Sequence, residues 1–127
     1  MGDNSKIAWT DATWNFLLGC EKVSAGCKYC YAMSSVHRMS FHPNVKVSSA
    51  NAGLTRKSAS GDAEWTGVVR FIPERIQIPL RWNRPRMIFV NSLSDIGHPS
   101  VEDSVIYQML DVMQHAPRHV FQVLSKR

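Results

Sequence analysis

The sequence contains no run of about eighteen apolar residues, the length that a membrane-spanning helix needs. Its first residues, MGDNSKIAWTD, also lack the basic start and the apolar stretch of a secretory signal peptide. These two absences argue against a helical membrane protein and against export. We therefore expect a cytoplasmic protein that has no membrane partner.

Cysteine is also scarce, because the chain has only three, at positions 20, 27 and 30. A secreted domain held together by disulfides usually has four or six, so this odd count argues against that class. Three thiols this close together, in a protein expected to be cytoplasmic, indicate ligands of a metal centre. Cys20, Cys27 and Cys30 are therefore the predicted metal ligands.

Neither the charge nor the composition is extreme. The net charge of +5 permits contact with nucleic acid or another acidic partner without requiring one. With 44% hydrophobic and 20% charged residues, the chain has the composition of a globular protein, and no internal repeat is visible. Its 127 residues suffice for one domain with a modest core, so we expect a single domain over residues 1–127.

Strands and helices alternate in the predicted secondary structure. Short apolar runs bounded by polar or turn residues predict four strands, at 14–18, 68–72, 87–90 and 120–124. Helix-compatible segments predict three helices, at 31–39, 73–82 and 100–115, with Ser100 as a cap for the last one. Residues 43–67 are rich in Ser, Ala, Gly and Asn, so we expect an irregular insertion there.

This alternation predicts an α/β fold, a parallel sheet of about four strands with crossover helices. The nearly continuous apolar runs MIFV and VFQVL are typical of buried parallel strands. Proteins of this class place their sites in the loops at the carboxyl ends of the strands. The cysteine loop, NSLSD and SKR all fall at such ends.

The cysteine loop suits an iron–sulfur cluster. A four-iron cluster needs soft anionic ligands, and cysteine thiolate is the usual one. Three cysteines would hold three irons and leave the fourth open to a substrate or cofactor. Gly26 lets the backbone bend close to a cluster, and Lys22 and Lys28 would offset part of its negative charge.

Zinc is the alternative metal, because three cysteines and one histidine form a common structural zinc site. His37 or His42 would then be the fourth ligand, although neither has the spacing of a compact zinc finger. The last alternative is no cofactor at all, with three buried thiols.

Several sequence blocks occur together in a fixed order: IAWTDATWN, GCEKVSAGCKYCYA, FIPERIQIPLRW, RPRMIFVNSLSDIGH and HVFQVLSKR. Together they resemble a phage-associated family of three-cysteine, radical-SAM-like proteins that is distantly related to the spore photoproduct lyase. The resemblance covers nearly the whole chain apart from about residues 43–66. It implies that the expected cytoplasmic location is the cytoplasm of a phage's host cell.

The resemblance implies that Cys20, Cys27 and Cys30 ligate a [4Fe–4S] cluster whose open iron is chelated by S-adenosylmethionine. One electron would cleave this cofactor into methionine and a 5′-deoxyadenosyl radical, which takes hydrogen from a substrate. Tyr29 matches an aromatic position near the adenine. The other residues expected to face the cofactor follow the third and fourth strands: Asn91, Ser92, Ser94, Asp95, Ser125 and Lys126.

Length is the main departure from this family. A radical-SAM core is a partial barrel of about six strand–helix units, so we expect an incomplete, truncated half of such a barrel. Its fourth strand would be an exposed edge, which a partner chain or a second copy would cover. The spacing C-x₆-C-x₂-C is also longer than the commonest C-x₃-C-x₂-C, and no Gly-Gly-Glu type of motif follows the second strand.

Three functions follow from these observations. The first is a radical-SAM enzyme half that acts on nucleic acid with a partner chain, since autonomous catalysis is not expected of so short a chain. The second is an inactive fragment that binds a protein or inhibits host defence, for example as an anti-CRISPR, through basic residues: Arg70, Arg75, Arg81, Arg84 and Arg86. The third is a structural zinc module that binds nucleic acid.

Overall fold

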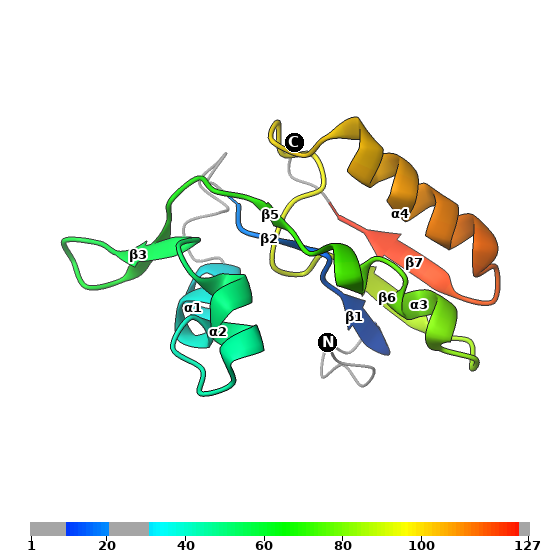
Figure 1. Ribbon diagram of the computed structural model, residues 1–127, viewed down its shortest axis with the longest axis horizontal. Coiled ribbons are helices and arrows are strands. Elements are labelled where there is room, and N and C mark those ends of the chain that lie inside the picture. Colours follow the sequence, from blue (N-terminus) through cyan, green and yellow to red (C-terminus); the bar gives the residue numbers. More distant parts are fainter. Residues whose placement is uncertain (1–9, 21–30, 125–127) are drawn as a thin grey trace.

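A three-stranded parallel sheet forms the centre of the protein in a computed structural model that describes residues 10–20 and 31–124 (Figure 1). Its strands are β1 (Ala12–Trp14), β6 (Met87–Val90) and β7 (Val120–Val123), in the order β1-β6-β7. Ala12 lies opposite Ile88 in β6, and Ile88 lies opposite Phe121 in β7. The predicted α/β class and parallel pairing are confirmed, but the parallel sheet has three strands instead of about four.

Helix α4 (Asp103–His115) covers one face of this sheet as the crossover between β6 and β7. Apolar side chains at helical spacing bury against the strands: Val105, Met109 and Val112. They meet Trp14, whose ring centroid lies 4.6 Å from that of Phe16 and 5.7 Å from that of Phe121. The predicted start of this helix was wrong, because Glu102 occupies the cap position and Ser100 lies in the turn before it.

The predicted first strand, 14–18, is two strands with different partners. After β1 the chain leaves the parallel sheet, and β2 (Leu17–Leu18) pairs antiparallel with β5 (Arg70–Phe71). The predicted second strand, 68–72, therefore lies outside the parallel sheet. The break lets Leu17 pack in the core under α4, while Leu18 packs in a second core.

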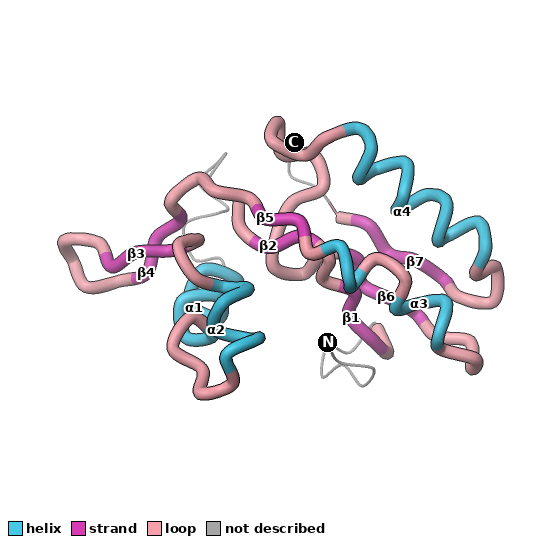
Figure 2. Tube along the Cα trace, viewed as in Figure 1, coloured by secondary structure: helices cyan, strands magenta, loops and turns pink. Residues whose placement is uncertain are grey.

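The second core lies under α1 (Tyr31–Met39), which matches the predicted helix 31–39 residue for residue. Residues 43–67 are not irregular, because they form α2 (Val45–Asn51) and a hairpin of β3 (Thr55–Lys57) and β4 (Ala63–Trp65), as Figure 2 shows.

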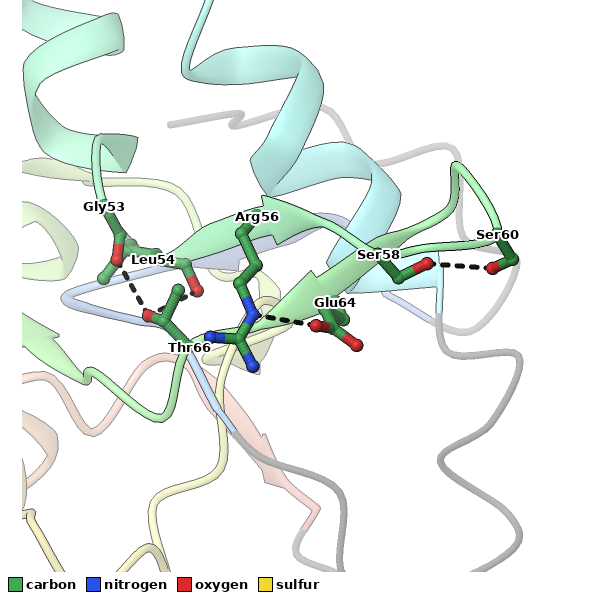
Figure 3. A network of polar contacts seen from close by, with 7 residues as sticks. All are labelled: Gly53, Leu54, Arg56, Ser58, Ser60, Glu64 and Thr66. Atoms are coloured by element: carbon green, nitrogen blue, oxygen red, sulfur yellow. Dashed lines mark hydrogen bonds and ion pairs between the residues drawn. The ribbon is translucent and has the colours of Figure 1, made fainter.

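Local hydrogen bonds and an ion pair explain why this segment forms regular structure although its sequence shows no clear periodicity. The Asn44 side chain accepts a hydrogen bond from Lys46 N and so caps α2. Arg56 and Glu64 pair across the hairpin at 2.8 Å (Figure 3). The Thr66 hydroxyl donates to the carbonyl of Gly53, which anchors the base of the hairpin.

The predicted helix 73–82 is interrupted. A 3₁₀ turn, η2 (Pro73–Arg75), is followed by the short helix α3 (Ile78–Arg81). Pro73 and Pro79 each stand near a helix start, where the missing N–H of proline costs least. The second proline thus begins a new helix instead of straining one long helix. None of the helices described is long and apolar enough to cross a membrane.

Gly19 is the position where two backbones come closest. Its φ is +96°, and a Cβ added there would overlap the carbonyl oxygen of Val68. Gly53 has a similar φ of +75°, but a Cβ added there would meet only open space. Alanine substitutions at the two glycines therefore distinguish the free-energy cost of a left-handed backbone from that of a steric clash.

We predict that Gly19→Ala lowers the free energy of unfolding by about 3 kcal/mol or more, since backbone strain and overpacking add. Gly53→Ala is the control and should cost only about 1 kcal/mol. Urea denaturation of both variants measures the difference. Equal losses for the two would show that the close approach at Gly19 is not a structural requirement.

Candidate functional site

The loop after β6 and the chain after β2 meet at the carboxyl edge of the parallel sheet. Gly19 forms a parallel bridge with Ser94, and its N–H donates to the carbonyl of Leu93 at 3.3 Å. Cys20 follows at once and is half-buried against the second core. The structure therefore brings the first predicted metal ligand beside the predicted loop 91–95.

Helix α1 reaches the same loop from the other end of the cysteine segment. The Tyr31 hydroxyl donates to the carbonyl of Ser92 at 2.9 Å, and Tyr31 directly follows Cys30 in the sequence. Gly19 and Tyr31 flank the cysteine segment, so both of its flanks contact residues 92–94. Cys27, Cys30, Tyr29, Ser125 and Lys126 lie outside the described residues, and their predicted roles stay predictions.

Two asparagines hold the chain where it leaves the sheet, and we call them the Asn15–Asn91 clamp. Asn91 N donates to the Trp14 carbonyl at 2.8 Å, and its Oδ1 accepts from Leu17 N at 3.1 Å. In return, Asn15 Oδ1 accepts from the N–H of Ser92 at 2.7 Å and from its hydroxyl at 3.1 Å. Each side chain thus satisfies the backbone of the opposite strand end, where ladder pairing stops.

Asn91 adopts a left-handed backbone with φ of 56°, which asparagine tolerates better than most residues. Sequence reasoning predicted Asn91 as a site residue but missed Asn15. The sequence did contain an indication of the role of Asn15, because this residue directly follows an apolar strand in the block TWN, just as Asn91 follows MIFV.

The loop after Asn91 buries several further polar side chains. Asp95 is buried, and its Oδ1 accepts from Gly97 N at 2.8 Å. His98, which sequence reasoning also missed, is buried with Nδ1 accepting from Ser100 N at 3.0 Å. Ser94 Oγ and Asn91 Nδ2 are buried without a hydrogen-bond partner. Such orphaned groups cost about 1–3 kcal/mol each.

The two histidines considered as zinc ligands lie on the α1–α2 side of the molecule. His37 Nδ1 lies 2.9 Å from the Thr55 hydroxyl, and His42 Nδ1 accepts from Asn44 N at 3.0 Å. Within residues 10–20 and 31–124, no three His, Cys, Asp or Glu side chains gather closely enough to hold a metal ion. A zinc site that includes Cys27 and Cys30 stays a prediction.

Fold and site together define a small α/β protein with a polar, partly buried site at the carboxyl edge of a parallel sheet. The chain belongs to the family described as "Protein of unknown function (DUF5131)", whose model matches residues 4–127. No curated protein and no solved structure matches the chain. The family description assigns no activity, so function has to be argued from the site.

We predict that Asn91→Gly lowers the free energy of unfolding by about 1–3 kcal/mol, because Leu17 N–H is left buried without its acceptor. Asn91→Ala should cost about 1 kcal/mol more, because alanine also bears the strain of the left-handed backbone. Chemical denaturation measures both, with Asn83→Ala at an exposed position as the control. Wild-type stability of Asn91→Gly would refute the clamp.

Proposed function

We propose that this protein binds a [4Fe–4S] cluster through Cys20, Cys27 and Cys30 and binds S-adenosylmethionine beside it, as in a radical-SAM site. One observation carries the proposal: both flanks of the cysteine segment contact residues 92–94 at the carboxyl edge of the sheet. This is the edge at which α/β proteins place cofactors. In this proposal, the three-stranded sheet is part of a radical-SAM half barrel.

The chemistry of the three cysteines suits such a group. Three thiolates are the soft donor set that iron–sulfur clusters need, and they leave one iron for a second ligand. Ser94 Oγ and Asn91 Nδ2, in the loop beside Gly19, are buried polar atoms without partners. When bound, the cluster would supply one-electron chemistry to S-adenosylmethionine.

The protein's own residues would position this site. The Asn15–Asn91 clamp holds the two loops together, and the left-handed backbone of Asn91 turns the chain from β6 into the loop. Cys30 immediately precedes α1, and the positive end of a helix dipole favours a thiolate. Tyr29, Ser92, Asp95, Ser125 and Lys126 remain proposed cofactor neighbours on the strength of the family resemblance.

Nucleic acid is the proposed substrate, and a partner chain is proposed to complete the enzyme. The net charge of +5 favours an anionic partner, although it does not select one. A cytoplasmic location in a host cell is part of the same proposal.

The proposal predicts the metal content of the protein. After anaerobic reconstitution with iron and sulfide, we expect about four irons and four sulfides per chain. Cys20→Ala, Cys27→Ala and Cys30→Ala should each hold less than about one iron, because each removes a cluster ligand. Iron, sulfide and zinc are quantified together in the wild type, in these three variants and in the control below.

Ser24→Ala, in the same segment, is the matched control and should retain the iron of the wild type. A folded wild-type protein without iron would overturn the proposal. One zinc per chain that is lost in the cysteine variants would favour the structural zinc module instead.

A second candidate function is binding of a protein through the edge of the sheet. Among the described residues, β7 is an edge strand that pairs only with β6. Val120 N donates to the Arg86 carbonyl, so the N–H groups of Phe121 and Val123 point away from β6. Val120 is 59% exposed and Val123 is 43% exposed. An apolar edge with unpaired donors favours pairing with a partner chain or a second copy.

Most of the arginines expected to form an interaction surface are half-buried. Arg70 donates to the carbonyls of Ser49 and Ala50, and Arg86 lies over the Trp82 ring at 4.9 Å. Arg75 is also half-buried, and of these five arginines Arg81 and Arg84 are the exposed ones. A binding or inhibitory role therefore depends on the edge of β7 more than on a basic patch.

We expect Val123→Lys to weaken any association through this edge by at least about tenfold, because a charged side chain there disfavours strand pairing. Val45→Lys is the matched control, since Val45 is 73% exposed on α2, away from the sheet edge. Sedimentation equilibrium of the wild type and both variants measures self-association. Unchanged association of Val123→Lys would exclude the edge as the interface between copies.

A further inference from the structure

A cavity of about 280 Å³ lies between the β1–β2 chain on one side and the α1–α2 helices on the other. Figure 1 shows these two helices on the side of β1 that faces away from β6 and β7. The polar residues of its wall are Thr13, Asn15, His42, Asn51 and Arg75. No Asp or Glu lines the cavity among the described residues.

Arg75 is the charged group in this wall. Its Nη1 donates to the Asn15 carbonyl at 3.1 Å, and a guanidinium carries five N–H donors in all. Burial lowers the pKa of Arg75, and the neighbouring Glu74 raises it in opposition. Arg75 is therefore half-buried in a cavity wall whose described residues include no acid, and this environment favours an anion as its partner.

Two other wall residues add directed polar groups. His42 is exposed and so stands where the cavity meets solvent, and its Nδ1 accepts from Asn44 N, which leaves Nε2 as a donor. Asn51 is only 4% exposed, and its Nδ2 donates to the Val47 carbonyl at 2.8 Å while its Oδ1 has no partner.

We propose that this cavity binds the oxyanion of a small ligand, a phosphate or a carboxylate group, with Arg75 as the main contact. Its volume lies just below the range of about 300–1,000 Å³ for drug-sized ligands, so it suits a small molecule or the end of a larger one. The described wall of the cavity contains no cysteine, and the titration below uses metal-free protein, so its result does not depend on a cluster.

Calorimetric titration of the metal-free full chain, at constant ionic strength, tests this with sodium orthophosphate and sodium acetate as separate probes. We expect at least one probe to bind with a Kd below about 1 mM, and the tighter probe identifies the oxyanion. Arg75→Gln should weaken that binding at least tenfold. Arg84→Gln, an exposed arginine outside the cavity, should leave it unchanged.

A second pair of variants guards against a folding defect in Arg75→Gln, which loses its bond to Asn15. His42→Glu places a negative charge at the cavity mouth, at an exposed position that folding tolerates, and should also weaken binding at least tenfold. His115→Glu, exposed on α4, is its control. Absence of binding for both probes, or binding that neither Arg75→Gln nor His42→Glu weakens, would overturn the proposal.

Discussion

The Asn15–Asn91 clamp holds the chain at the point where it must change partners. Before the clamp, β1 pairs parallel with β6; after it, β2 pairs antiparallel with β5. Ladder pairing cannot continue across such a change, so the backbone groups there need side-chain partners. Asn91 Oδ1 supplies one to Leu17, and Asn15 Oδ1 supplies one to Ser92. The two cores and the candidate site all depend on this crossing point.

The clamp also explains why the site residues lie together. Directly beyond it, Gly19 brings its backbone against Val68 and bridges to Ser94, which only a residue without a side chain allows. Tyr31, the first residue of α1, then contacts the same loop, because its hydroxyl donates to the Ser92 carbonyl. The cysteine segment therefore begins and ends beside one loop, and that loop carries orphaned buried polar atoms at Asn91 and Ser94.

The elements predicted correctly from sequence were those whose signals are local. The segments 31–39 and 87–90 match to the residue, because uninterrupted helix-compatible sequence and a buried apolar run each indicate one structure. The region 43–67 failed, because its helix and hairpin depend on a side-chain cap and on cross-strand pairs that periodicity does not reveal. The segment 14–18 failed because strand partners are a long-range property. Its two halves bury equally apolar side chains in different cores.

The neighbourhood of Cys20 could be predicted in part from the topology. Parallel strands place their carboxyl ends at one edge, so residues 91–95 were expected near Cys20, and the structure puts them there. Asn15 and His98 were missed because their roles arise from contacts with distant backbone or from burial. An open cavity beside α2 had no sequence signal at all, since its wall draws on Thr13, Asn51 and Arg75 from separate segments.

The most direct test of the proposed site is the electron paramagnetic resonance spectrum of the anaerobically reconstituted, reduced protein before and after addition of S-adenosylmethionine. We expect a reduced [4Fe–4S] signal whose g values shift on addition, since three cysteines leave one iron open to the cofactor. A signal that S-adenosylmethionine leaves unchanged, or no signal from a well-folded protein, would contradict it.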